Sequence, residues 1–197
     1  MKRFVLVAAL ALAACGQEQQ RQSHETYPVA NAPSYDTTIG PDGAAGITEP
    51  VEMTVASVRA AAPHYVVAEV DDQIEGQALK AITLSAGDEE VFRVYPTADG
   101  RHVHSVVTRS TQAHSPVDEI VGQAKFAVAP PEQVTFCKAE SVDSAPGFAC
   151  STAEDGPFWR VYRLPDGAGP ADSFDDIEPD LLHDSTLVEM RWVAPRA

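Results

Sequence analysis

Positive charge is scarce in this sequence. Its 197 residues include 14 Lys and Arg against 29 Asp and Glu, which gives a formal net charge of −15. Proteins that bind nucleic acid neutralise phosphates with basic side chains, so this composition argues against nucleic acid as a partner. A basic protein or a divalent cation would be attracted instead. The same charge also fits the simpler role of keeping the protein soluble.

Long apolar runs are also absent. The apolar stretch from Phe4 to Leu12 is too short to cross ~30 Å of bilayer hydrocarbon, which takes about 20 helical residues. It matches the apolar part of a signal peptide, and the preceding Lys2 and Arg3 match the basic start of one. A transmembrane anchor is the weaker interpretation, and we expect the chain to be exported.

A lipoprotein cleavage motif closes this stretch. The sequence Leu12-Ala13-Ala14-Cys15 resembles a lipobox, where a signal peptidase cleaves before the cysteine and lipid is attached to its thiol. We predict that residues 1–14 are the signal peptide and that Cys15 is lipidated, a plain secretory signal being the alternative. More than one acyl chain makes such an anchor stable. Gly16 follows the cysteine where Asp would favour the inner membrane, so we expect the outer membrane.

Apolar periodicity is missing from Gly16 to about Ala45, a stretch rich in Gln, Pro and Gly. No face of such a segment is expected to pack against a core. We therefore predict that residues 15–45 form the lipidated N-terminus and a flexible tether. Residues 46–197 then form a single periplasmic domain, whose roughly 150 residues are typical of one domain.

Cysteines are few, and two remain besides the predicted lipidation site. An exported chain meets an oxidising compartment, so a disulfide between Cys137 and Cys150 is expected. Closing a loop this short stabilises the fold by roughly 3 kcal/mol. Redox chemistry or metal ligation is the alternative, but neither cysteine lies in a Cys-x-x-Cys motif or beside a histidine.

Catalytic and cofactor motifs are missing as well. The sequence contains no Gly-x-Ser-x-Gly, Ser-x-x-Lys or His-Glu-x-x-His motif and no Gly-rich phosphate loop. We predict that the protein is not an enzyme and needs no cofactor. The acidic stretch from Asp172 to Asp180 lacks the glycine that an EF-hand needs at its sixth position, so it is predicted to be a solvated loop.

Two histidines are the weak candidates for a metal site. His102 and His104 alternate along a predicted strand, which places their side chains on one face about 6–7 Å apart. Imidazole suits zinc and copper, and His114 or a carboxylate would complete the site. Two solvent-facing histidines beside a turn is the simpler interpretation.

Short β-branched runs between turn residues predict the strands. The candidates are residues 64–70, 78–84, 90–95, 102–108, 133–138, 148–151, 158–164 and 186–193. Tight turns, including a hairpin at Asp99-Gly100, make the first four an antiparallel meander. In the last strand the alternation places Val188, Met190 and Trp192 on one face and Leu187, Glu189 and Arg191 on the other. Trp159 and Trp192 are expected to anchor the core.

Helical spacing occurs twice. Val51, Val55, Val58 and Ala62 recur at three- and four-residue steps after Thr48, which predicts a short helix capped by Thr48, although Val51 to Val55 also fits a strand. Ser115-Pro116-Val117-Asp118 looks like a helix start, and a helix to Ala124 would follow, or else a strand to Val121 with a helix after it. The predicted fold class is α+β, an antiparallel meander with one or two helices.

With these features placed, the chain resembles the RpoE-regulated lipoprotein family, whose members are bacterial envelope lipoproteins with a domain of unassigned molecular function. The shared points are the lipobox at Cys15, a start at Gly46 with a helix led by Pro50, the hairpin at Asp99-Gly100, Val121-Gly122, the pair Cys137 and Cys150, and a last strand ending near Trp192. The resemblance covers roughly residues 46–197. It implies a role in the envelope, linked to envelope stress, and transfers no catalytic residue.

The sequence therefore predicts an outer-membrane lipoprotein that contacts another envelope component. An inhibitor of a basic hydrolase such as lysozyme is one alternative, because acidic, disulfide-bonded, β-rich lipoproteins include such inhibitors. A periplasmic metal-binding protein acting through His102 and His104 is the other.

Overall fold

The computed structural model describes residues 34–74 and 76–195. The predicted signal peptide, the lipidation site at Cys15 and the tether up to residue 33 lie outside these residues. Within them the predicted α+β class is confirmed. An antiparallel sheet dominates, two short helices accompany it, and a disulfide joins Cys137 to Cys150.

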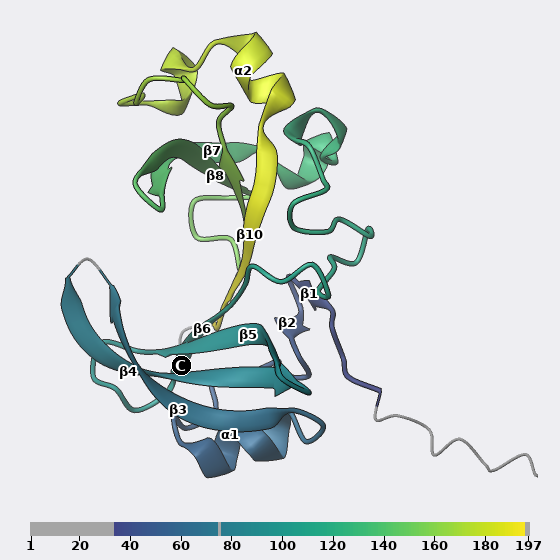
Figure 1. Cartoon of the computed structure of the whole chain (residues 1–197), viewed down its shortest axis with the longest axis vertical. Helices are drawn as coiled ribbons and strands as arrows, with labels where there is room; N and C mark the ends of the chain where they lie inside the picture. Colours follow the sequence, from purple (N-terminus) through teal and green to yellow (C-terminus); the bar gives the residue numbers. More distant parts are fainter. Residues whose placement is uncertain (1–33, 75, 196–197) are drawn as a thin grey trace, which may run out of the picture. The chain divides into compact units, whose positions relative to one another are not determined.

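Eight strands form the main sheet. They are β3 (Val66–Ile74), β4 (Gln77–Ala86), β5 (Glu89–Pro96), β6 (Val103–Thr108), β7 (Phe136–Val142), β8 (Ala145–Ser151), β9 (Phe158–Arg163) and β10 (Thr186–Val193). Their order is β3-β4-β5-β6-β10-β9-β8-β7, and every neighbouring pair is antiparallel. The predicted meander is confirmed, and a second meander joins it where β6 pairs with β10 (Figure 1).

The main hydrophobic core lies against one face of this sheet. Alternation along the strands turns Val94 of β5, Val106 of β6 and Trp192 of β10 to this face, where each is 1 % exposed or less. Trp159 of β9 is also buried, but it belongs to a smaller apolar cluster with Val161. Both tryptophans are therefore core residues, in two different clusters.

The segment before residue 46 is not a tether where the structure describes it. Two short strands, β1 (Ile39–Gly40) and β2 (Gly43–Ala44), pair with each other. Ile39 is fully buried in the core, and the hydroxyl of Tyr65 donates a hydrogen bond to the carbonyl of Asp36 at 2.7 Å. The prediction failed here because a few apolar residues between prolines and glycines are enough to pack, although they show no periodicity. The ordered chain extends at least to residue 34.

The first helix begins later than predicted. Helix α1 (Val55–Ala61) is capped by Thr54, whose side-chain oxygen accepts a hydrogen bond from the backbone N–H of Ser57 at 3.1 Å. Before this helix, Glu52 forms an isolated bridge with His102, and the carbonyl of Val51 accepts a hydrogen bond from the N–H of Val103 at 2.8 Å. The predicted helix is therefore confirmed only from Val55, and residues 51–54 form neither a helix nor a strand.

The predicted helix from Ser115 to Ala124 is wrong. Asp118 has a φ of 62°, which no α-helix contains, and Glu119 folds back so that its N–H and its carboxylate both bind the hydroxyl of Ser115. The buried guanidinium of Arg160 then binds the Glu119 carboxylate at 2.7 Å. This ion pair between residues distant in sequence outweighs the local preference for a helix. Sequence spacing could not reveal the ion pair. Two 3₁₀ turns follow, η1 (Phe126–Val128) and η2 (Pro131–Gln133).

The acidic stretch before the last strand is partly helical. It contains a 3₁₀ turn, η3 (Phe174–Asp176), and the second helix, α2 (Pro179–Asp184). Proline at the first helical position explains why this helix starts where it does. The sequence prediction of a loop up to Asp180 therefore missed α2.

Turn positions also differ from the prediction. β3 continues through the predicted turn at 71–76 as far as Ile74, and the connection between β5 and β6 spans residues 97–102 with Gly100 at a φ of 72°. Two-residue turns connect other strands, among them Gly87-Asp88 between β4 and β5 and Asp143-Ser144 between β7 and β8, where Asp143 and Ser144 have φ values of 50° and 67°. Their positive φ suits the twist of the β7–β8 hairpin.

A bulge changes the faces of β10. The pairing with β9 shifts between Leu187 and Glu189, so one residue is inserted. Leu187 consequently shares the core face with Met190 and Trp192, while Val188 joins the smaller apolar cluster. The predicted alternation is correct beyond the bulge and reversed before it.

Candidate binding cleft on the open face of the sheet

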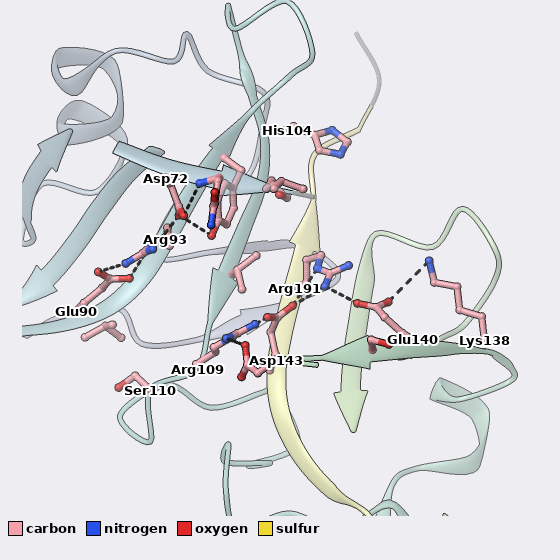
Figure 2. A pocket seen from close by; sticks show the side chains of 18 of the residues that line it. Asp72, Glu90, Arg93, His104, Arg109, Ser110, Lys138, Glu140, Asp143 and Arg191 are labelled. Carbon is pink, nitrogen blue, oxygen red and sulfur yellow. Dashed lines mark hydrogen bonds and ion pairs between the residues drawn. The ribbon is translucent and has the colours of Figure 1, made fainter. Parts of the chain in front are cut away.

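A cleft of about 1260 Å³ lies on the face of the sheet opposite the main core. Strands β3, β5, β6, β7 and β10 all contribute to its walls, as Figure 2 shows. Its charged lining consists of Asp72, Glu89, Glu90, Arg93, Arg109, Lys138, Glu140, Asp143, Glu189 and Arg191. We refer to it below as the charged cleft.

Strand register brings these side chains together. Arg93 of β5 and Arg191 of β10 both pair with Val107 of β6, on either side of it. Neighbouring strands lie about 4.8 Å apart, so the two arginines stand two strands apart on the same face. The alternation that buries Met190 and Trp192 thus places Arg191 in the cleft.

Glu189 is the centre of the charged cleft. It is only 5 % exposed, and its two carboxylate oxygens are bound by different arginines. Arg109 donates from Nε to Oε2 at 2.9 Å, and Arg191 donates from Nη2 to Oε1 at 2.6 Å. Carboxylates this deeply buried are stable only when paired and hydrogen-bonded, and here both oxygens meet this condition.

The ion pairs continue to the hairpin of β7 and β8. Arg109 also binds Asp143 at 2.8 Å, and Arg191 binds Glu140 at 3.1 Å. Since β9 and β8 separate β10 from β7 in the sheet, the last contact requires the sheet to bend towards this face. Gly147 of β8 permits the bend, because a Cβ there would lie 2.9 Å from a methyl group of Val142 and against the carbonyl oxygen of Tyr162.

A second ion-pair group forms the opposite wall. Arg93 binds Asp72 of β3 and Glu90 of β5, each at 2.8 Å, and the hydroxyl of Tyr95 donates to Asp72 at 3.1 Å. Burial acts to raise the pKa of Asp72, but hydrogen bonds from the Gln73 N–H, Arg93 and Tyr95 outweigh it and lower that pKa below its ordinary value. The contact holds the end of the β3–β4 hairpin over the cleft.

The arginines of the cleft are firmly charged. Burial acts to lower the pKa values of Arg109 and Arg191, but their carboxylate partners outweigh burial and raise both values. The guanidinium groups of Arg109 and Arg191 are therefore held in place as ion pairs with their carboxylate partners. What the arrangement offers a ligand is a rigid set of hydrogen-bonding groups, bordered by exposed Lys138 and His104.

The predicted site residues are only partly brought together. His104 lies at the rim of the charged cleft and His102 is exposed at the start of β6, outside it. Within residues 34–74 and 76–195, no three His, Cys, Asp or Glu side chains gather closely enough to hold a metal ion. Cys137 and Cys150 occupy directly paired positions on β7 and β8.

Sequence reasoning missed the cleft itself. A usable signal was present in the last strand, where Glu189 and Arg191 alternate with apolar Met190 and Trp192. An acid and a base two residues apart on one face of a strand point away from the core. Their partner Arg109 lies far away in sequence, so only the fold identifies it.

A separate polar cluster lies inside the core. Arg160 is 1 % exposed, binds Glu119 and Gln133, and stacks on the ring of Phe158 at 4.7 Å from its centroid. The nearby Tyr162 hydroxyl is buried, and burial together with the Glu119 charge raises its pKa. This cluster fixes the segment between β6 and β7 on the sheet and is closed to solvent.

Membrane crossing by a helix is not seen in the part of the chain that the structure describes, because neither helix is long and apolar enough. No protein-family model matches the sequence, and no curated protein does. Among solved structures, the fold is similar to the uncharacterized protein YfeY from Escherichia coli, with a TM-score of 0.55 and 15 % sequence identity. The similarity covers 80 % of this chain and 99 % of YfeY, so nearly the whole YfeY fold has its counterpart here.

Proposed function

We propose that this protein is an outer-membrane lipoprotein, anchored through Cys15, whose periplasmic domain binds another envelope component through the charged cleft. The anchor rests on the basic start, short apolar stretch and lipobox of residues 1–15. A binding role rests on the cleft, whose ionised groups are locked in pairs around Glu189. The proposal makes this a binding protein and not an enzyme.

Membership of the RpoE-regulated lipoprotein family is part of the same proposal. The residues that carry the resemblance extend from Cys15 to Trp192. The fold shared with YfeY is consistent with this family. A role linked to envelope stress follows from the family alone.

The observation that carries the binding role is the composition of the cleft wall. Only ten Lys and Arg residues occur among the described residues, and Arg93, Arg109, Lys138 and Arg191 all line this one cleft. Six carboxylates accompany these four basic residues, so the surface is densely polar and carries a small net negative charge. Such a surface gives specificity through positioned hydrogen bonds and charge pairs.

Site-specific photo-crosslinking in cells tests the proposal. A photoreactive residue replaces Lys138, an exposed position in the cleft, in the full lipoprotein, and captured proteins are identified by mass spectrometry. Val66, which is 60 % exposed and outside the cleft, provides the matched control position. We expect one envelope protein to be captured from Lys138 and not from Val66, and a basic hydrolase such as lysozyme would be recognised in the same way.

Two results contradict the proposal. Equal capture from both positions would mean that the cleft is not the contact surface. Cleft positions that capture nothing, when Lys138 and His104 are both tried in a fully anchored protein, would argue against a protein partner in the cleft.

A further inference from the structure

The main sheet has two free edges, β3 and β7, because neither is followed by another strand in the sheet. In an antiparallel pair every second residue turns its N–H and C=O away from the partner strand. An edge strand therefore presents a row of backbone groups that can pair with an added strand. The two edges differ in how many of these backbone groups already have hydrogen-bond partners.

On β7 the outward row consists of Cys137, Ala139 and Ser141. The two-residue turn makes Val142 and Ala145 the closing pair, so the hydrogen-bonded positions are the even-numbered residues of β7. No hydrogen bond involves the backbone groups of these three residues in the described part of the chain. Two of the three, Ala139 and Ser141, also line the charged cleft.

On β3, two of the corresponding outward backbone groups already take part in hydrogen bonds. Arg59 of α1 donates a hydrogen bond to the outward carbonyl of Val67 at 3.3 Å, and the N–H of Gln73 binds the side chain of Asp72 at 2.7 Å. The acidic side chains beside the row are neutralised as well, because Lys80 binds Asp71 at 2.7 Å. This edge is blocked at both ends.

An uncompensated acidic segment lies beside β7. The turn η3 contacts β7, and Phe174 packs on Phe148 of β8 from the core side. The surrounding carboxylates are Asp172, Asp175, Asp176, Glu178 and Asp180, and none has an ion-pair partner among residues 34–74 and 76–195. Cys137, Ala139 and Ser141 face this same side, and the last two are too small to shield it.

We propose that the β7 edge accepts an extended segment of a partner protein as a ninth strand, with basic side chains at the alternate positions that face η3. Backbone pairing with Cys137, Ala139 and Ser141 supplies the attachment, and the acidic segment selects the basic side chains. The other row of partner side chains faces the charged cleft. The inference rests on the proposed binding function and names the class of partner and the edge that it uses.

The test uses the full lipoprotein in a non-ionic detergent and a fluorescent peptide of alternating lysine and threonine, about as long as β7. Fluorescence anisotropy measures binding, and hydrogen exchange measures the amides of Ala139 and Ser141. We expect binding and slower exchange at both amides. A peptide with glutamate in place of lysine, and one with proline in place of threonine, should not bind.

Ala139→Pro removes one outward N–H without touching the bonds to β8, and it should weaken binding about tenfold. The matched control is Glu69→Pro, at an outward position of β3, which should leave binding unchanged. Thermal melting verifies that both variants fold. Replacing Asp175 and Asp176 by asparagine leaves the backbone row intact and should weaken binding to a similar degree.

The inference is overturned if the peptide does not bind, if it binds without protecting the two amides, or if Glu69→Pro weakens binding as much as Ala139→Pro. Capture of a partner from Lys138 in cells, with no effect of Ala139→Pro on that capture, would leave the cleft proposal standing while removing the strand-addition inference. If neither capture in cells nor peptide binding is observed, both the cleft proposal and the strand-addition inference are wrong.

Discussion

Glu189 shows at the scale of single residues how the charged cleft is held. Its carboxylate is buried between Arg109 and Arg191, so it stabilises both arginines and is stabilised by them. We expect Glu189→Gln to lower the free energy of unfolding by about 3 kcal/mol, because two partly buried cations then lose their shared partner. Urea denaturation measures this change. Asp143→Asn, which breaks the exposed Arg109 pair, should cost less than about 1 kcal/mol, and an equal loss in both variants would contradict the central role of Glu189.

The ionisation of Asp72 makes the stability of the folded protein depend on pH. Its pKa is lowered in the folded protein from an ordinary value of 3.8, so its pairing with Arg93 and Tyr95 stabilises the fold above that pH. The stabilisation is lost as the pH falls through the lower, folded value. We expect Asp72→Asn to reduce the free energy of unfolding by about 1 kcal/mol at neutral pH, and the difference from the parent should shrink below pH 3.8. A difference that grows on acidification would refute this assignment.

Single residues also mark where sequence reasoning stops. The expected oxidising compartment predicts the disulfide partners, and hydrophobicity predicts that the two tryptophans lie in the core. Strand alternation predicts that Arg191 points away from the core. The pairing of Glu119 with Arg160 does not follow, because the sequence around Glu119 gives no sign that Arg160 of β9 is buried beside it. Contacts that are distant in sequence decide these positions.

At the scale of elements, the β7–β8 hairpin depends on its disulfide. Cys137 and Cys150 are directly paired, with 13 residues of sequence separation. We expect the double replacement Cys137→Ser and Cys150→Ser to lower the free energy of unfolding by about 3 kcal/mol. Denaturation under non-reducing conditions measures this loss. The parent in reducing agent should lose a similar amount, and an unchanged parent would show that the bond contributes little.

Elements were predicted well where one periodicity ran through them. The strands from residue 64 to residue 108 and the strand 158–164 follow from alternating or continuous β-branched runs. The exact faces of β10 did not follow, because the bulge inserts Val188 between the paired residues Leu187 and Glu189 and reverses the pattern. The helix assigned to 115–124 failed because a cap-like start does not outweigh a buried ion pair.

At the scale of the whole molecule, the expected location depends on one thiol. Replacing Cys15 by alanine removes the predicted lipid anchor, so the protein should appear in the soluble fraction after cell lysis. The control is the double replacement of Cys137 and Cys150 by serine, which keeps Cys15 and should remain with the membranes. Fractionation followed by immunoblotting measures both. Membrane association that survives Cys15→Ala would contradict the proposed anchoring.

The joining of the two meanders has a consequence for how the chain reaches its fold. The first meander ends in β6, whose outer partner β10 is the last strand of the chain. Until β10 arrives, β6 presents unpaired backbone and the core lacks Met190 and Trp192. Pairing so distant in sequence is slow, and exposed strand edges invite aggregation meanwhile. Synthesis therefore delivers the closing strand last, and the interval before it docks is when a chaperone would protect the nascent chain most.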